Sequence, residues 1–133
     1  MILVDTSVWI DYFNGFENDE TDILDQALGN NVVAVGDLIV LEILQGFRSD
    51  KDYKTAKKYL SSLRQFGMLS PELAIKAAEN YRKLRKQGMT IRKTTDVIIA
   101  TFCIENSLPL LYTDKDFIPF TKKLKLRSVS QKT

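Results

Sequence analysis

Hydrophobic residues along the chain occur in two arrangements, short unbroken runs and positions spaced by three or four residues. Short apolar runs bounded by polar residues are typical of strands buried on both faces, as in a parallel sheet covered by helices. Runs of this kind predict strands at residues 2–4, 32–35, 109–112 and 124–129. The pattern therefore indicates an α/β fold with a mostly parallel sheet.

The longer segments between these strands repeat their apolar residues at helical spacing. They predict helices at residues 8–13, 17–28, 38–45, 50–66, 71–87 and 96–106. The last of these segments is apolar nearly all round, so we expect a helix buried in the centre of the molecule. A polar basic loop is expected at 89–95, and a short polar tail after residue 129.

The length of 133 residues predicts a single domain spanning 1–133, with one hydrophobic core. No apolar run approaches the roughly 20 residues that span a bilayer, and no basic segment precedes the first strand. We therefore expect no membrane contact and a cytoplasmic location. The one cysteine, Cys103, excludes an internal disulfide and a cysteine-rich metal site.

The chain contains no histidine. Any mechanism that uses imidazole as a general base or a metal ligand is therefore excluded. A metal in this protein would have mostly oxygen ligands, which favours Mg²⁺ or Mn²⁺ over zinc.

The net charge of +2 is distributed unevenly along the chain. Residues 1–47 contain nine acidic and no basic residues, whereas residues 48–133 contain nineteen basic and eight acidic ones, giving −9 and +11. This division suits a protein that holds a cation beside a polyanion. Two solvated helix surfaces of opposite sign would also explain it.

Five acidic residues stand where they could share one site. Asp5 follows the first strand, Asp114 and Asp116 follow the strand at 109–112, and Asp96 lies at the start of the apolar helix. In open α/β sheets ligands bind at the carboxyl ends of the strands. Glu42 lies in an apolar helix that offers it no polar face, and no arginine in the first 47 residues could pair with it.

Each acid taken alone also has a structural explanation. Asp5 could cap the following helix, Asp96 could favour the helix dipole, and Asp114 and Asp116 could form a surface turn. Several carboxylates at one sheet edge stay ionised together only if a cation neutralises them. Their convergence therefore favours a Mg²⁺ or Mn²⁺ site.

Four segments in this order resemble the PIN-domain ribonucleases, specifically the VapC-type toxins of toxin–antitoxin pairs. They are residues 5–11, Glu42, residues 88–100 and residues 110–117. The resemblance covers essentially the whole chain. It implies a three-layer α/β/α sandwich, Mg²⁺- or Mn²⁺-dependent cleavage of RNA, homodimerisation and inhibition by a small antitoxin protein.

By position, the resemblance assigns roles to seven residues. The acidic quartet is Asp5, Glu42, Asp96 and Asp114, with Asp116 as a fifth acid and Thr6 and Thr113 as supporting hydroxyls. In the implied mechanism the acids position the metal, which lowers the pKa of a bound water, and this water attacks the phosphodiester in line.

The basic residues nearest to these acids in sequence are Arg92 and Lys93, which we expect to contact RNA phosphates. The basic group at 82–86 could extend this contact or could be a solvated helix face.

Two other classes of protein also combine a small α/β fold with clustered acids. A receiver-like regulatory domain should have paired acids after the first strand, and an Asp-based phosphatase should have a second Asp where Ser7 stands.

Overall fold

The structure of the protein is a computed structural model in which residues 1–129 are described, and the polar tail predicted after residue 129 lies outside the described residues. Four strands form one sheet in the order β3-β2-β1-β4, with every neighbouring pair parallel. They are β1 (Ile2–Val4), β2 (Val33–Gly36), β3 (Arg64–Phe66) and β4 (Leu110–Leu111). In the central strand β1, Leu3 is paired with Ala34 on one side and Leu110 on the other.

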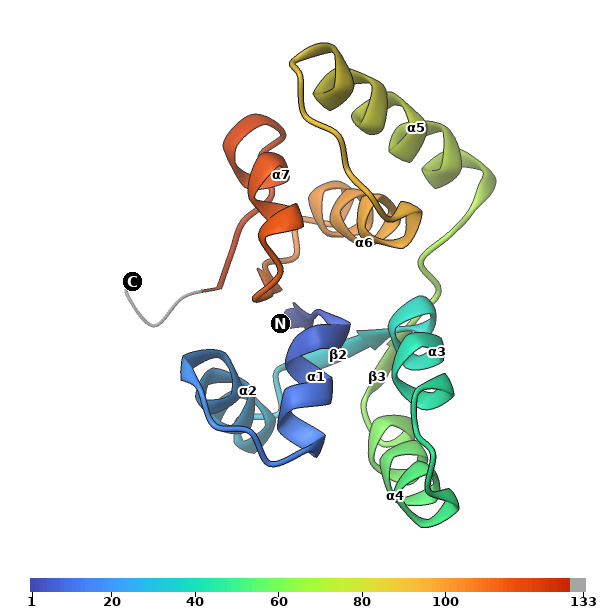
Figure 1. Cartoon of the computed structure of the whole chain (residues 1–133), viewed down its shortest axis with the longest axis vertical. Coiled ribbons are helices and arrows are strands. Elements are labelled where there is room, and N and C mark those ends of the chain that lie inside the picture. The colour runs from blue at the N-terminus through green and yellow to red at the C-terminus, as the bar shows by residue number, and fades with distance from the viewer. Residues whose placement is uncertain (130–133) are drawn as a thin grey trace.

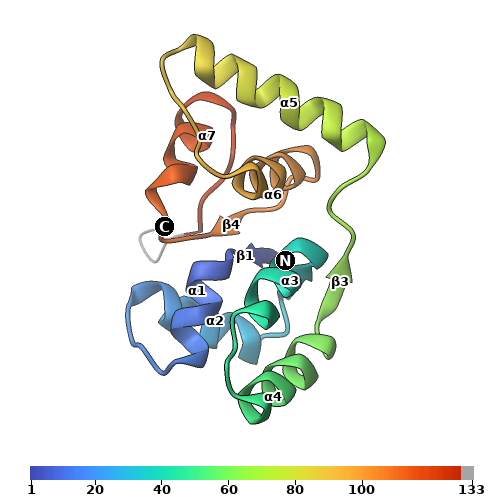
Figure 2. The same cartoon turned by 45° about the vertical axis from the view of Figure 1, so that its right-hand side comes forward.

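Helices cover both faces of this sheet (Figures 1 and 2). Helices α5, α6 and α7 lie on one side, and α1 to α4 lie on the other. The helices are α1 (Thr6–Phe13), α2 (Asp19–Gly29), α3 (Asp37–Gln45), α4 (Asp50–Ser61), α5 (Pro71–Lys86), α6 (Thr94–Glu105) and α7 (Ile118–Lys123), with a 3-10 turn η1 (Lys115–Phe117). The predicted α/β/α arrangement is confirmed.

The core is centred on β1 and α6. Leu3 and Val4 are fully buried, and so are the aromatic side chains of Trp9, Phe117 and Phe120. Seven of the twelve residues of α6 are buried, which confirms the central helix that the apolar pattern predicts. Helix α6 packs against α5 and lies between α5 and the sheet (Figure 2), so few of its side chains reach water.

The predicted helix at 50–66 is wrong at its carboxyl end. Helix α4 ends at Ser61, and residues 64–66 form the edge strand β3, which pairs with β2. Arg64 and Gln65 are exposed, so this strand carries neither an apolar run nor an inward-facing alternation. Backbone pairing with β2 makes it a strand, and this long-range contact leaves no local hydrophobic signal.

The predicted strand at 124–129 is also wrong in extent. Only one bridge forms there, between Leu110 and Ser128, supported by backbone hydrogen bonds of Leu110 N to Arg127 O and of Val129 N to Leu110 O. Lys125 has a φ of 68°, in the left-handed region, which interrupts the extended chain before it reaches β4.

Candidate functional site

A cavity of about 130 Å³ lies at the carboxyl edge of the sheet. Strands β1 and β4 are adjacent and parallel, so the residues that follow them meet there, together with the start of α6 and the middle of α3. The lining residues are Asp5, Thr6, Ser7, Ile10, Glu42, Lys93, Asp96 and Asp114. The fold therefore brings all four acids of the predicted quartet to one cavity.

Asp5 is both a helix cap and a member of this cavity. It is 5% exposed, and its Oδ2 atom accepts hydrogen bonds from Ser7 N at 3.4 Å and from Ser7 Oγ at 2.8 Å. Burial raises the pKa of Asp5 above its ordinary value, and the Ser7 hydrogen bonds oppose that rise. Capping and a place in the site are compatible because a carboxylate has two oxygens.

Glu42 is held by hydroxyl groups from two other helices. Its Oε1 atom accepts a hydrogen bond from Thr6 Oγ1 at 2.8 Å, and its Oε2 atom accepts one from Thr95 Oγ1 at 3.4 Å. Glu42 is half-buried, and within residues 1–129 no basic side chain forms a salt bridge with it. The hydroxyls fix the carboxylate but leave its charge in place.

Asp96 has the most strongly raised pKa of the acids that line the cavity. It is 4% exposed, and its buried Oδ2 atom has no hydrogen-bond partner among the described residues. Burial, followed by the charge of Asp5, raises the pKa of Asp96 to about 7. A buried carboxylate oxygen without a donor is unfavourable in a folded protein, and a bound cation would remove that cost.

Asp114 and Asp116 stand beside Asp96 on the turn after β4. Asp114 Oδ1 caps η1 by accepting a hydrogen bond from Asp116 N at 2.9 Å. One ligand oxygen from each of Asp96, Asp114 and Asp116 lies within 4.8 Å of the other two. These three oxygens are close enough to bind one cation, with Asp5 and Glu42 lining the same cavity.

The two predicted phosphate-binding residues lie against these acids. Arg92 Nη2 is 3.4 Å from Asp116 Oδ2, and Lys93 Nζ is 3.7 Å from Asp114 Oδ2. Asp96, foremost among the nearby acids, raises the pKa of Lys93. Both basic side chains are mostly exposed, at 79% and 58%, so these ion pairs are weak and can be exchanged for others.

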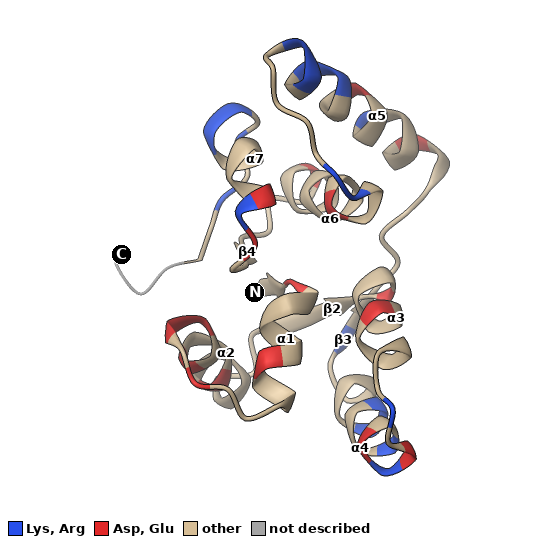
Figure 3. Cartoon of the chain, in the orientation of Figure 1, with Lys and Arg blue, Asp and Glu red and all other residues tan. Residues whose placement is uncertain are grey.

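Basic and acidic residues are concentrated on different parts of the structure. Figure 3 shows basic positions at the carboxyl end of α5, in the loop before α6 and on α7, whereas acidic positions dominate α2. The four basic side chains at 82–86 are exposed on α5, and Arg85 stacks over the ring of Tyr81 at 5.6 Å. The uneven charge of the sequence thus becomes an uneven charge in space.

Two hydroxyl residues in the site were missed by the sequence interpretation. Ser7 binds Asp5 and also lies 3.1 Å from Thr113, oxygen to oxygen, and Thr95 contacts Glu42. An Asp followed two residues later by Ser at a helix start is a local capping signal that could have indicated Ser7. No local signal indicates Thr95, because its partner is 53 residues away in sequence.

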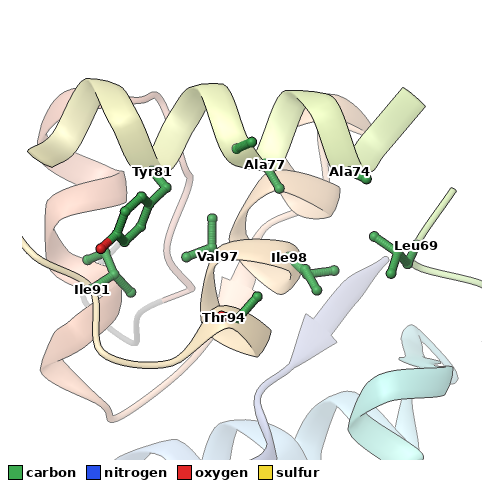
Figure 4. A pocket seen from close by; sticks show the side chains of 9 residues that line it. Leu69, Ala74, Ala77, Tyr81, Ile91, Thr94, Val97 and Ile98 are labelled. Atoms are coloured by element: carbon green, nitrogen blue, oxygen red, sulfur yellow. The ribbon is translucent and has the colours of Figure 1, made fainter. Parts of the chain in front are cut away.

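A larger cavity, of about 380 Å³, lies between α5 and α6 (Figure 4). Its walls are mainly apolar: Leu69, Ala74, Ala77, Ala78, Tyr81, Ile91, Thr94, Val97 and Ile98. Three of them, Thr94, Val97 and Ile98, come from α6 and are spaced three and four residues apart, so they share one face of that helix. Asp96 lies on a different face. The cavity contains no carboxylate, so the acid chemistry belongs to the smaller one.

The fold and the acid-lined cavity correspond to one class of protein. The chain belongs to the PIN-domain family, whose family model matches residues 2–123. It is 27% identical over 132 residues to ribonuclease VapC11 of Mycobacterium tuberculosis, with 98% of each chain covered. It is 29% identical over 126 residues to ribonuclease VapC1 of Methanocaldococcus jannaschii, covering 95% of this chain and 85% of that relative.

A solved structure agrees with this assignment at the level of the fold. The VapBC2 complex of Rickettsia felis, bound to a DNA fragment from its promoter, matches with a TM-score of 0.76 and 19% identity, over 97% of this chain and 98% of that chain. The resemblance to PIN domains and VapC proteins that the motifs indicate is therefore confirmed. Among the described residues, no helix is long and apolar enough to cross a membrane.

Proposed function

We propose that the protein is an endoribonuclease that depends on Mg²⁺ or Mn²⁺ and acts as the toxin of a toxin–antitoxin pair. The observation that carries this proposal is the buried Oδ2 atom of Asp96, which has no donor among residues 1–129 and belongs to one of the four acids that line the cavity. The relatives support the reaction class, since those that match over nearly the whole of this chain are named VapC ribonucleases.

The donor set fits a hard divalent cation. Asp96, Asp114 and Asp116 offer three oxygens close together, and Asp5 and Glu42 add negative charge at the same cavity. Such an ion, when bound, acidifies water and offsets the charge of a phosphodiester. The chain has no histidine that could serve as a base without a metal.

The remaining polar residues would position the acids and the RNA. Thr6 keeps Glu42 in one orientation through its 2.8 Å hydrogen bond, and Thr113 lies 3.1 Å, oxygen to oxygen, from Ser7, which lines the cavity. Lys93 lines the cavity, and Arg92 and Lys93 are both paired with acids that a cation would also attract. A phosphate arriving with the RNA would give these two side chains an anionic partner next to the reacting bond.

The proposed partners are a cognate antitoxin protein and a second copy of this chain. The antitoxin is supported by the fold neighbours, whose structures are described as VapBC or toxin–antitoxin complexes. Large apolar side chains remain exposed on the described surface, among them Leu41 at 58%, Leu69 at 53% and Ile75 at 65%. Side chains of this kind mark a protein contact where they form one continuous patch.

RNA cleavage by the purified protein tests the proposal. We expect cleavage with Mg²⁺ or Mn²⁺, none with EDTA, and a large loss in Asp114→Asn, whereas Glu79→Gln on the exposed face of α5 should cleave normally. Expression in bacteria should arrest growth for the wild type and not for Asp114→Asn. Undiminished cleavage in EDTA would contradict the metal-dependent mechanism. Phosphoryl transfer or phosphatase activity without RNA cleavage would favour the receiver-like or the phosphatase class instead.

A further inference from the structure

Ser7, the second residue of α1, makes more polar contacts at the cavity than a helix start requires. Its backbone N and its Oγ both donate to Oδ2 of Asp5, at 3.4 and 2.8 Å. Its Oγ also lies 3.1 Å from Oγ1 of Thr113, which follows β4. A backbone hydrogen bond alone would cap the helix, so the hydroxyl contacts call for a separate explanation.

The direction of these hydrogen bonds follows from counting protons. A serine hydroxyl has one proton and two acceptor positions, and an ionised carboxylate only accepts. The proton of Ser7 is donated to Asp5, so the hydrogen bond with Thr113 must use the Thr113 proton. The result is a chain from Thr113 to Ser7 to Asp5 that joins the ends of the adjacent strands β1 and β4.

This chain makes the two oxygens of Asp5 unequal. Both hydrogen bonds from Ser7 go to Oδ2, and within residues 1–129 no side chain donates to Oδ1. Groups that hydrogen-bond to a metal-ligating carboxylate orient it, and replacing such groups typically weakens metal binding 10- to 100-fold.

We propose that Ser7 is a positioning residue that engages Oδ2 of Asp5 and thereby directs Oδ1 to the cation, and that Thr113 acts only through Ser7. This inference rests on the proposed function, because it assumes that the acids bind a divalent ion. It assigns no direct contact with RNA or with the metal to either hydroxyl.

The test is a cycle of four proteins: wild type, Ser7→Ala, Thr113→Val and the double variant. Mn²⁺ binding is measured by isothermal titration calorimetry without RNA, and the Mg²⁺ concentration for half-maximal cleavage is measured in parallel. We expect Ser7→Ala to weaken Mn²⁺ binding roughly tenfold or more. We expect Thr113→Val to weaken it roughly 2- to 10-fold, the effect of one neutral hydrogen bond. The double variant should bind no more weakly than Ser7→Ala.

Two further variants separate positioning from general structural effects. Thr113→Ser keeps the hydroxyl and should bind Mn²⁺ as the wild type does, and Ser61→Ala removes an exposed hydroxyl on α4 and should also have no effect. Melting temperatures without metal identify variants that are misfolded. If Ser7→Ala is misfolded, the comparison of Thr113→Val with Thr113→Ser still tests the chain, because equal Mn²⁺ binding in the two would contradict it.

Each other outcome counts against a specific part of the proposal. Normal Mn²⁺ binding by Ser7→Ala would show that the Ser7 hydroxyl has no part in metal binding, and it would overturn the inference. Additive losses in the double variant would mean that Thr113 acts directly on metal or substrate, which the inference excludes. A wild-type protein that binds no Mn²⁺ would overturn the proposed metal site, and the inference with it, so the two failures are distinguishable.

Discussion

Replacing Asp96 by Asn should stabilise the protein in the absence of metal. The side chain is 4% exposed, its Oδ2 atom has no donor among the described residues, and other carboxylates line the same cavity. Ionised Asp96 is therefore unfavourable in the folded state, and its pKa is raised from 3.8 to about 7. Asparagine has nearly the same shape and removes the charge.

The size of the effect follows from that pKa. Each pKa unit corresponds to 1.36 kcal/mol, so the rise from 3.8 to about 7 destabilises the folded protein by roughly 4 kcal/mol above pH 7, where Asp96 is ionised in both the folded and the unfolded state. The folded state binds the proton more tightly, so this cost diminishes as the pH falls below 7. That pKa already includes the attraction between Asp96 and Lys93, so we expect a gain of about 2 to 4 kcal/mol at pH 8 and less than half of it at pH 5.

Thermal unfolding in EDTA at pH 8 and pH 5 measures this gain. At pH 8 the melting temperature of Asp96→Asn should exceed that of the wild type by an amount on the order of 10 °C. Mg²⁺ should raise the melting temperature of the wild type and not that of the variant, since the variant lacks one ligand. Glu79→Gln, which removes an exposed charge on α5, is the control and should melt like the wild type. A variant that is no more stable than the wild type at pH 8, or equally stabilised at both pH values, would refute the reasoning.

Three further outcomes are expected. Replacing Arg92 and Lys93 by Ala should weaken RNA binding and flatten its dependence on salt. The slope of log affinity against log salt concentration should fall by roughly 0.7 for each phosphate that these side chains neutralise, as measured by filter binding at several salt concentrations. An unchanged slope would remove both residues from the RNA site. Glu42→Gln should lose most cleavage yet melt within a few degrees of the wild type without metal, because the half-buried amide can still accept from Thr6; normal cleavage would contradict its role. Gly36→Ala should lower the free energy of unfolding by roughly 1 to 3 kcal/mol, since a Cβ there would overlap the buried Met68 sulfur. Urea unfolding measures this loss. An unchanged free energy of unfolding would show that Met68 moves aside easily.

Local signals in the sequence were sufficient to identify most of the elements and the acids. The apolar run of β1 is strong because it is buried on both faces, and α6 is recognisable because it is covered on nearly every side. Asp5 and Asp114 could be assigned to one edge because the carboxyl ends of adjacent parallel strands lie together. Each of these inferences needs only neighbouring residues and a general rule of α/β topology.

The predictions that were wrong concern segments whose structure depends on distant partners. Strand β3 exists because its backbone pairs with β2, and its exposed side chains give it no apolar pattern. Residues 124–129 contain apolar positions, but the left-handed backbone of Lys125 limits their pairing with β4 to a single bridge. Hydrophobic periodicity reports burial, and it does not report backbone pairing at the edge of a sheet.

The sequence by itself thus determined the class of fold and the acids that line the cavity. Only the tertiary structure decided how those acids are held: which oxygen of Asp5 is hydrogen-bonded, and that Asp96 has an oxygen without a donor among the described residues. Ser7 and Thr113 are 106 residues apart in the chain and 3.1 Å apart in space. Such contacts are set by the packing of whole strands and helices, whereas local propensity and spacing depend only on near neighbours, so no pattern of nearby residues contains them.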